Sequence, residues 1–318
     1  MQSTTNTTHI FEEAERYLKT VGDILRFAVS TFNQHNLCYG HGTTNAYDEA
    51  AYLILHTLHL PHDQLAPYIS NVLLPHEIHK VLAILKKRVL KRIPAAYLTN
   101  EAICQGYSFY VNEDVIIPRS FLAEIIVNNG LQPWIEHPEL VHNVLDLCTG
   151  NGSVAIIAAD YFEDSCVIAS DIDPKALAIA QKNIDNYQFQ DRVQLIKSNL
   201  FTNLKKHKGQ FDLILTNPPY VDSNRMGSLP AEYLHEPQIA LDGGGDGLEL
   251  IDKILHEAKH FLSEFGVLVV EMGDNQVQLQ ARYPTLPFTW LSTASGDGFV
   301  FVLTRNELNK KIPNITKL

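Results

Sequence analysis

The stretch Val144-Leu145-Asp146-Leu147-Cys148-Thr149-Gly150-Asn151-Gly152-Ser153 decides the fold of this chain. It begins as a short apolar run, passes through a loop with two glycines, and continues into Val154-Ala155-Ile156, which is typical of a buried helix. Glycine lets a backbone approach a ligand closely, and the first turn of a helix offers N–H groups without partners in the helix. The stretch therefore predicts a strand, a ligand-binding loop and a helix in direct succession.

Around this stretch, short β-type runs alternate with helical segments. The alternation predicts a mostly parallel sheet with helices on both faces and with ligands at the carboxyl ends of its strands. No helical segment separates the last two runs, so we expect one antiparallel edge. The runs are 141–147, 167–170, 193–196, 211–216, 265–271, 289–291 and 300–303.

The residues before this region have a different pattern. Apolar residues at three- and four-residue spacing predict helices at 17–32, 47–60 and 76–89. The β-forming runs 104–111 and 114–117 flank Asn112-Glu113-Asp114 and predict a hairpin. We therefore expect four parts: a helical domain at 1–100, a hairpin linker at 101–120, an α/β domain at 121–308 and a tail at 309–318.

The composition limits the class of function. A net charge of −11, from 25 basic and 36 acidic residues, argues against tight binding to bare nucleic acid. The four cysteines form no Cys-x-x-Cys pair, which favours a reducing compartment. The sequence starts without an apolar signal-peptide core, and its apolar runs are far shorter than the roughly 18 residues of a membrane span. We therefore expect a cytoplasmic protein without a membrane partner.

Two carboxylates indicate which cofactor the glycine loop binds. Gly150-x-Gly152-x-x-Ala155 also matches the dinucleotide fingerprint, so the glycines alone would fit a dehydrogenase. Asp146, however, would repel a pyrophosphate, whereas it could face the cationic groups of S-adenosylmethionine. Asp171 follows the next β-type run and is well placed to accept hydrogen bonds from ribose hydroxyls. The alternative is that both aspartates only shape their loops.

A second loop carries a candidate for catalysis. The run 211–216 leads directly into Asn217-Pro218-Pro219-Tyr220. Two prolines fix φ and remove two backbone donors, which leaves a rigid loop that displays carbonyl groups. The Asn217 side-chain oxygen and the Pro218 carbonyl can each accept one hydrogen of an N–H₂ group, and Tyr220 can pack on a flat substrate. The alternative is a tight turn without chemistry.

These motifs together resemble the class I S-adenosylmethionine methyltransferases that act on amino nitrogens, and among them the glutamine side-chain amide methyltransferases. The resemblance covers most of the chain. Besides the two loops it rests on Arg92–Thr99, Ile117-Pro118-Arg119 with Glu124, Glu236–Leu241 and Gly243–Gly247. It implies a Rossmann-like, mostly parallel seven-stranded sheet with an antiparallel edge, preceded by a helical substrate-recognition domain and a linking hairpin.

Three features resemble one branch of this family. One branch methylates class 1 release factors, and the other methylates the third protein of the large ribosomal subunit (uL3). Cys148, the segment Tyr39–Ala50, and the five-residue step from Arg119 to Glu124 are similar to the ribosomal-protein branch. The resemblance therefore implies methyl transfer to a glutamine of a uL3-like protein, either free or in an assembly intermediate, without sequence-specific nucleic acid binding.

The predicted site residues follow from the motifs and the resemblance. The catalytic residues are Asn217, Pro218 and Tyr220, and the substrate-binding residues are Asn217, Pro218, Pro219, Tyr220 and Glu236. The cofactor-binding residues are Asp146, Cys148, Thr149, Gly150, Gly152, Asp171, Ile172, Asn199, Leu200 and Asn217. Asn199 stands where the family usually has Asp to accept from the adenine amino group. We predict no metal, because His76 and His79 have the wrong spacing for a zinc helix.

The sequence is also compatible with rival functions. A release-factor methyltransferase and a DNA or RNA amino methyltransferase would use the same Asn217–Tyr220 loop. A cofactor-binding ribosome-assembly factor without turnover is a rival from another class.

Acidic residues gather after the loop, and we expect them to border its mouth and to steer a basic substrate. They are Glu232, Glu236, Asp242, Asp246, Glu249 and Asp252.

Overall fold

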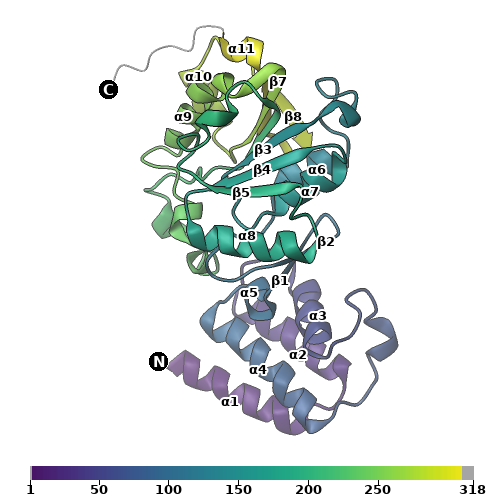
Figure 1. Cartoon of the computed structure of the whole chain (residues 1–318). Helices are drawn as coiled ribbons and strands as arrows, with labels where there is room; N and C mark the ends of the chain where they lie inside the picture. The colour runs from purple at the N-terminus through teal and green to yellow at the C-terminus, as the bar shows by residue number, and fades with distance from the viewer. Residues whose placement is uncertain (1, 310–318) are drawn as a thin grey trace. The chain divides into compact units, whose positions relative to one another are not determined.

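The computed structural model of the protein describes residues 2–309 and divides into two units (Figure 1). The first consists of Met1–Ala102 together with Pro230–His235. The second consists of Ile103–Leu229 and Glu236–Leu318. The short segment 230–235 therefore packs with the helical residues, although it follows the sixth strand in sequence. The predicted tail lies, from residue 310 on, outside the described residues.

The first unit is helical. Its helices pack their apolar faces on a core that includes Phe32, Leu53 and Leu85, each fully buried. The first predicted helix began too early, because Thr20 and Asp23 form a capping box that starts a new helix at Val21. The helices are α1 (Gln2–Tyr17), α2 (Val21–Gln34), α3 (Ala46–Thr57), α4 (Pro75–Lys91) and α5 (Ala95–Thr99).

A β-hairpin follows, but its position differs from the prediction. Strand β1 (Glu101–Cys104) pairs with β2 (Tyr107–Tyr110), so the turn is Gln105-Gly106. Both turn residues have positive φ, 50° and 83°, which matches the twist of a two-residue hairpin. The predicted strand 104–111 contains this turn, and the predicted turn at Asn112 is a local one, in which the Asn112 side chain accepts from the N–H of Asp114 at 3.0 Å.

The second unit holds a seven-stranded sheet in the order β5-β4-β3-β6-β7-β9-β8. The first five strands in this order are parallel, while β9 runs antiparallel to both β7 and β8. This confirms the predicted α/β fold with an antiparallel edge. The strands are β3 (Asn143–Leu147), β4 (Cys166–Asp171), β5 (Val193–Lys197), β6 (Phe211–Thr216), β7 (Leu262–Glu271), β8 (Thr289–Thr293) and β9 (Gly296–Thr304).

Helices cover both faces of this sheet (Figure 1). Successive residues of a strand point to opposite faces, so Val144 and Leu145 of β3 belong to different apolar clusters. Helices α6 (Phe121–Val127), α7 (Ser153–Tyr161) and α8 (Pro174–Asn186) contribute to the first cluster. Helices α9 (Glu249–Glu257), α10 (Gln276–Arg282) and α11 (Arg305–Asn309) contribute to the second.

Residues 2–309 lack two features of other classes of protein. No helix in this range is long and apolar enough to cross a membrane. No group of three or more His, Cys, Asp or Glu side chains in the same range could hold a metal ion. All four cysteines are free thiols.

Candidate active site

The strand register brings the predicted site residues to one edge of the sheet. Leu147 of β3 lies beside Ser170 of β4 and Thr216 of β6. The residues that follow these three positions therefore emerge side by side at the carboxyl ends of the strands: the glycine loop in the middle, Asp171 on one side and Asn217 on the other. Asn199 follows β5, one strand beyond Asp171. Three strand spacings, roughly 14 Å, separate the two ends of this row.

The glycine loop makes a tight turn between β3 and α7. Cys148, Gly150 and Gly152 all have positive φ, at 63°, 56° and 82°. Gly152 is the N-cap of α7, and a Cβ there would lie 3.2 Å from the Cβ of Ala180 on α8. Thr149 is buried, and its N–H donates to the carbonyl of Ser170 at 2.9 Å. The loop is therefore fixed by its neighbours and presents the start of α7.

Asp146 lies beneath this loop. Its side chain is 2% exposed and accepts a hydrogen bond from the Thr149 hydroxyl. Burial raises the pKa of the Asp146 carboxyl to about 7, even though the Thr149 bond acts in the opposite direction. A buried carboxylate without a basic partner is costly when ionised, so a positively charged ligand would stabilise it.

Asp171 is the last residue of β4, and its carboxylate binds two backbone N–H groups. Its oxygens accept from the N–H of Gly150 and the N–H of Asp173, both at 2.9 Å. Burial raises the pKa of this carboxyl as well. Each carboxylate oxygen keeps a further lone pair for another donor. Asp173 itself caps α8 through the N–H of Lys175 at 2.9 Å, as the Asp-Pro sequence indicates.

The remaining predicted cofactor residues lie at the same end of the sheet with different exposure. Ile172 is exposed, at 44% of its surface. Asn199 is exposed and lies two residues after β5, whereas Leu200 is buried with a φ of 45°. The row thus offers an apolar side chain and an amide beyond Asp171.

The Asn217–Tyr220 loop continues β6 past the sheet. Asn217 is half-buried, Pro218 is buried, and Pro219 and Tyr220 are half-buried. The chain then pairs with a later segment: the N–H of Val221 donates to Leu241 at 2.9 Å, and Gly243 donates to Val221 at 2.8 Å. The loop is therefore held at both ends.

Glycines line the surface on which Tyr220 rests. A Cβ on Gly243 would lie 2.7 Å from the Cα of Tyr220, and one on Gly273 would lie 2.6 Å from its ring. Real Cβ contacts are essentially never this short. The Asn275 side chain adds a hydrogen bond to the Tyr220 carbonyl. Glycine is thus required at positions 243 and 273, where the backbone contacts Tyr220.

The chain is similar to known proteins over most of its length. The model of the "Methyltransferase small domain" family matches residues 129–270. The ribosomal protein uL3 glutamine methyltransferase of Neisseria gonorrhoeae is 53% identical over 94% of this chain and 99% of its own length. Proteins of the same description from Burkholderia pseudomallei and Bordetella pertussis are 48% and 45% identical, over 91% and 92% of this chain and 96% and 97% of their own.

This chain belongs to the family of ribosomal protein uL3 glutamine methyltransferases.

It is therefore a methyltransferase, and S-adenosylmethionine is its cofactor. A solved structure, the catalytic domain of hMettl16 in complex with the MAT2A 3'UTR hairpin 1, shares the fold with a TM-score of 0.50. It is 15% identical over 81% of this chain and 91% of its own.

The residues of this methyltransferase fit the cofactor. Asp146 is a buried carboxylate that a cationic group would stabilise, and Asp171 has acceptor capacity for hydroxyls. Asn151, which the sequence did not single out, is 2% exposed, and its Nδ2 finds no acceptor within the described residues. A buried donor without an acceptor costs about 1–3 kcal/mol, so a ligand oxygen there would be stabilising. Its position between the two glycines was the signal that could have identified it.

Glu271 and Ser120 form a second buried contact that the sequence did not reveal. The Ser120 hydroxyl donates to Glu271 at 2.6 Å, and the N–H of Phe121 donates to the same oxygen at 2.9 Å. Ser120 is also the N-cap of α6. Burial raises the pKa of the Glu271 carboxyl to about 7. Glu271 ends β7, next to β6, so it fixes α6 to the same edge of the sheet as the methyltransferase loops.

The predicted acidic rim of the methyltransferase is wrong for its two buried members, Glu232 and Glu236. Four of its six carboxylates are paired with arginines: Glu232 with Arg88 and Arg92, Glu236 with Arg119, and Asp246 and Asp252 with Arg282. Glu232 and Glu236 are therefore compensated within the fold and do not face solvent, whereas steering of a basic protein by the other four carboxylates stays a prediction. Glu232 belongs to the first unit and the other five to the second.

Glu236 was predicted to bind substrate. Its side chain is 5% exposed, and it accepts from Arg119 at 2.8 Å and from the N–H of Ile117 at 3.0 Å. These contacts fix the chain from Ile117 to Arg119, which precedes α6. Contact of Glu236 with a substrate stays a prediction.

Proposed function

We propose that this protein transfers a methyl group from S-adenosylmethionine to the side-chain amide nitrogen of a glutamine in ribosomal protein uL3. Relatives described as uL3 glutamine methyltransferases match this chain over nearly their whole length. The single observation that carries the proposal is the rigid Asn217–Tyr220 loop, which emerges from β6 directly beside the glycine loop after β3.

The loop suits an amide nitrogen. The lone pair of a planar amide is delocalised, so the nitrogen attacks only when its geometry and its developing charge are supported. We propose that the Asn217 Oδ1 and the Pro218 carbonyl accept the two hydrogens of the substrate N–H₂ group. Both bonds strengthen as positive charge develops on nitrogen, which lowers the barrier rather than merely tightening binding. Tyr220, held by Gly243 and Gly273, packs against the substrate and fixes its plane.

The neighbouring loops hold the cofactor in this proposal. Asp146 balances the cationic end of the molecule, and Asp171 accepts from the ribose hydroxyls. Cys148, Thr149, Gly150 and Gly152 give the backbone surface between them, with Ile172, Asn199 and Leu200 at the adenine end. When bound, S-adenosylmethionine supplies a methyl group on a positively charged sulfur. The chain contributes orientation and electrostatic support, with Asn217 at the boundary between cofactor and substrate.

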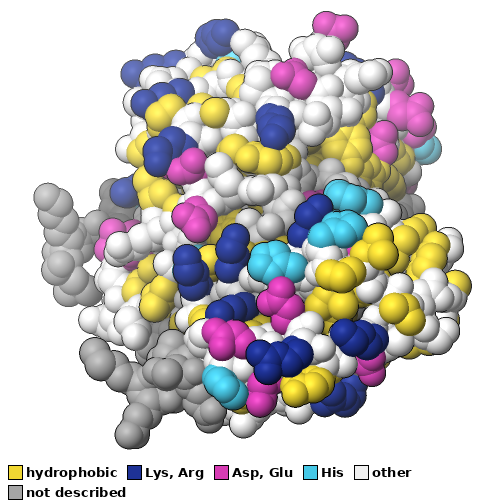
Figure 2. All heavy atoms as spheres, turned by 90° about the horizontal axis from the view of Figure 1, so that it is seen from below, with side chains coloured by type: hydrophobic (Ala, Val, Ile, Leu, Met, Phe, Trp, Pro, Cys, Tyr) yellow, Lys and Arg dark blue, Asp and Glu magenta, His cyan; other side chains and the backbone are white. Residues whose placement is uncertain are grey.

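The helical unit is proposed as the region that recognises the protein substrate. On the face that Figure 2 shows, basic and acidic side chains are interspersed with apolar ones. Large apolar side chains of this unit are exposed, including Tyr17 at 70%, Val72 at 72% and Leu74 at 58%. A mixed surface of this kind is typical of protein partners, whereas a nucleic acid requires a concentrated basic footprint.

Methyl-labelled S-adenosylmethionine tests the proposal. The enzyme is incubated with ribosomal proteins and with precursor large subunits from cells that lack this methylation, with release factors and total RNA as parallel samples. Label on uL3, in the free protein or in the precursor particle, is the expected result. Label on a release factor or on RNA would assign the substrate elsewhere, and binding of the cofactor without any label would indicate an assembly factor.

A further inference from the structure

The segment Pro230–His235 connects the two units through the chain itself. Only nine residues separate it from Tyr220 of the proposed substrate loop. The chain leaves the second unit after Leu229, packs with the helical unit for six residues, and returns at Glu236. We call residues 221–229 the strap, because they join the substrate loop to this segment. Most of the strap is exposed, including Arg225.

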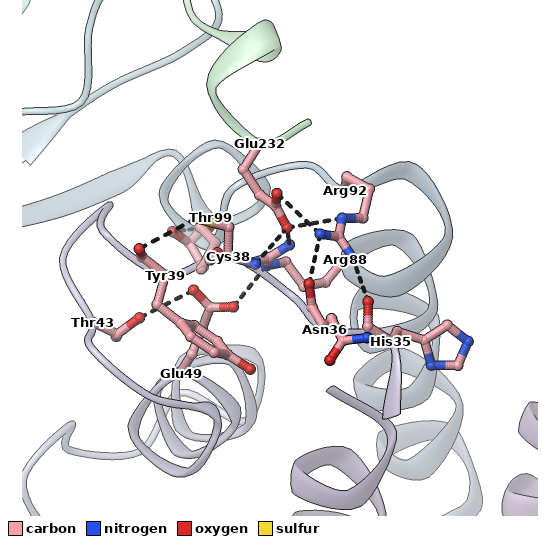
Figure 3. A network of polar contacts seen from close by, with 11 residues as sticks. His35, Asn36, Cys38, Tyr39, Thr43, Glu49, Arg88, Arg92, Thr99 and Glu232 are labelled. Atoms are coloured by element: carbon pink, nitrogen blue, oxygen red, sulfur yellow. Dashed lines mark hydrogen bonds and ion pairs between the residues drawn. The ribbon is translucent and has the colours of Figure 1, made fainter. Parts of the chain in front are cut away.

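Glu232 anchors the segment inside the helical unit (Figure 3). Its side chain is fully buried. It accepts from Arg88 Nη1 at 3.0 Å and from the N–H of Cys38 at 3.0 Å, and Arg92 Nε lies 2.9 Å from the same oxygen. Although burial opposes ionisation, the Arg88 bond helps to hold the pKa of the Glu232 carboxyl below its usual value.

Arg88 is the centre of this contact. It is fully buried in α4 and binds three groups at once. Besides Glu232, it donates to Glu49 of α3 at 2.7 Å and to the Cys38 carbonyl at 2.8 Å. Figure 3 shows these partners converging on Arg88 from different elements. Each of the three guanidinium nitrogens of Arg88 is thus engaged, and Glu232 accepts from Nη1.

Two neighbours of Glu232 reinforce the same placement. His235 lies 2.9 Å from the Lys91 carbonyl at the end of α4. The Tyr233 ring packs on His41, with ring centroids 4.4 Å apart. A Cβ on Gly40 would lie 2.7 Å from the Tyr233 hydroxyl, so the loop before α3 fits closely around this residue.

A buried ion cluster of this kind is weak evidence for added stability. Replacing such a cluster by apolar residues is often neutral or stabilising, whereas removing one partner is costly. The other end of the strap is also fixed, since Val221 pairs with Leu241 and Gly243 in the second unit. The strap therefore has two anchored ends, one beside the substrate loop and one in the helical unit.

We propose that Glu232 is a positioning residue: by anchoring Pro230–His235 in the helical unit, it aligns the Asn217–Tyr220 loop with a protein held by that unit. This inference rests on the proposed function and adds to it how recognition and methyl transfer are coupled. Loss of the anchor would leave the substrate protein and the cofactor bound but poorly aligned, which lowers kcat.

The chain contains a matched control for the test. Glu232→Gln and Glu49→Gln each remove one buried carboxylate from Arg88, but only Glu232 belongs to the segment that follows the strap. With uL3 as substrate, Glu232→Gln should lower kcat at least tenfold while KM and the Kd for S-adenosylmethionine stay within twofold. Glu49→Gln should keep kcat within twofold at a comparable loss of melting temperature. Equal losses of kcat in both variants, or no loss in either, would overturn the proposal.

Trypsin provides a readout that does not need the substrate. Cleavage after Arg225 should be at least fivefold faster in Glu232→Gln than in Glu49→Gln or the wild type, because only the first variant frees one end of the strap. Equal cleavage rates would contradict the anchor even if methylation of uL3 is confirmed. Conversely, faster cleavage with no activity of the wild type on uL3 would leave the anchor standing and refute the proposed substrate. If Glu232→Gln does not fold, Arg92→Gln, whose side chain is 25% exposed, serves in both assays.

Discussion

The Nδ2 of Asn275 donates a hydrogen bond to the main-chain oxygen of Tyr220 at 2.9 Å. Asn275 immediately precedes α10, whereas Tyr220 follows β6, so the bond joins two distant parts of the second unit. Together with Gly243 and Gly273 it determines where the tyrosine lies. The position of Tyr220 is thus a property of the surrounding fold rather than of the four-residue loop alone.

Gly243 provides a test of that position. Because a Cβ there would lie 2.7 Å from the Cα of Tyr220, Gly243→Ala should displace the loop and lower kcat at least a hundredfold with little change in the Kd for S-adenosylmethionine. Gly245→Ala, where the nearest atom would be 3.6 Å away, is the matched control and should keep normal turnover. Steady-state kinetics and calorimetry on both variants compare them directly, and normal turnover by Gly243→Ala would show that the loop is not held as described.

Asp146 predicts a pH dependence of cofactor binding. Burial raises its pKa to about 7 in the free protein, so below pH 7 the carboxyl is largely protonated and cannot balance a cation. The affinity for S-adenosylmethionine should therefore increase about tenfold per pH unit up to pH 7 and level off above it. Isothermal titration calorimetry between pH 5.5 and pH 8.5, values chosen to span this pKa by about 1.5 units on each side, measures the profile. Asp146→Asn should bind weakly at every pH, and a flat profile for the wild type would remove Asp146 from the cofactor site.

Glu271 predicts a pH dependence of stability with a defined sign. Its pKa rises from 4.5 to about 7 on folding, so the folded state binds more protons than the unfolded state between these values. Its contribution is then fully present below pH 4.5 and is lost as pH rises through 7, by roughly 3 kcal/mol in all. Other groups titrate in the same range, so the comparison is the wild type against Glu271→Gln.

The expected result for this pair is a difference in slope. Between pH 5 and pH 8, a range chosen about the ordinary and raised carboxyl pKa values, the free energy of unfolding should fall more steeply for the wild type than for Glu271→Gln in urea titrations. Parallel curves for the two proteins would mean that Glu271 ionises normally in the folded state.

Local sequence patterns were sufficient to predict much of the fold. The strand positions followed from apolar runs such as 211–216, and the order of motifs placed Asp146, Asp171 and Asn217 at the carboxyl ends of neighbouring strands. These features depend on residues close together in sequence and on the general behaviour of parallel sheets. The hairpin turn was misplaced because Gln105-Gly106 is a weaker turn signal than Asn112-Glu113-Asp114, although glycine at that position supports the positive φ.

Long-range pairs could not be predicted in the same way. Arg88 and Glu232 are 144 positions apart in sequence, and the composition offers many equally plausible partners for either charge. Their composition alone therefore suggests a surface field for the acidic residues after β6, whereas four of them are paired with arginines. The supporting role of the glycines at 243 and 273 depends likewise on tertiary contacts with Tyr220.

The central claim is that the Asn217–Tyr220 loop directs a methyl group to a glutamine amide of uL3. The most direct measurement is tandem mass spectrometry of uL3 after incubation with S-adenosylmethionine and either the wild type or Asn217→Ala, with cofactor binding by both proteins measured in parallel. The account predicts one methyl group on a glutamine side-chain nitrogen with the wild type, and at least a hundredfold less with Asn217→Ala at nearly unchanged cofactor affinity. A methyl group on another residue type, or near-normal methylation by Asn217→Ala, would contradict it.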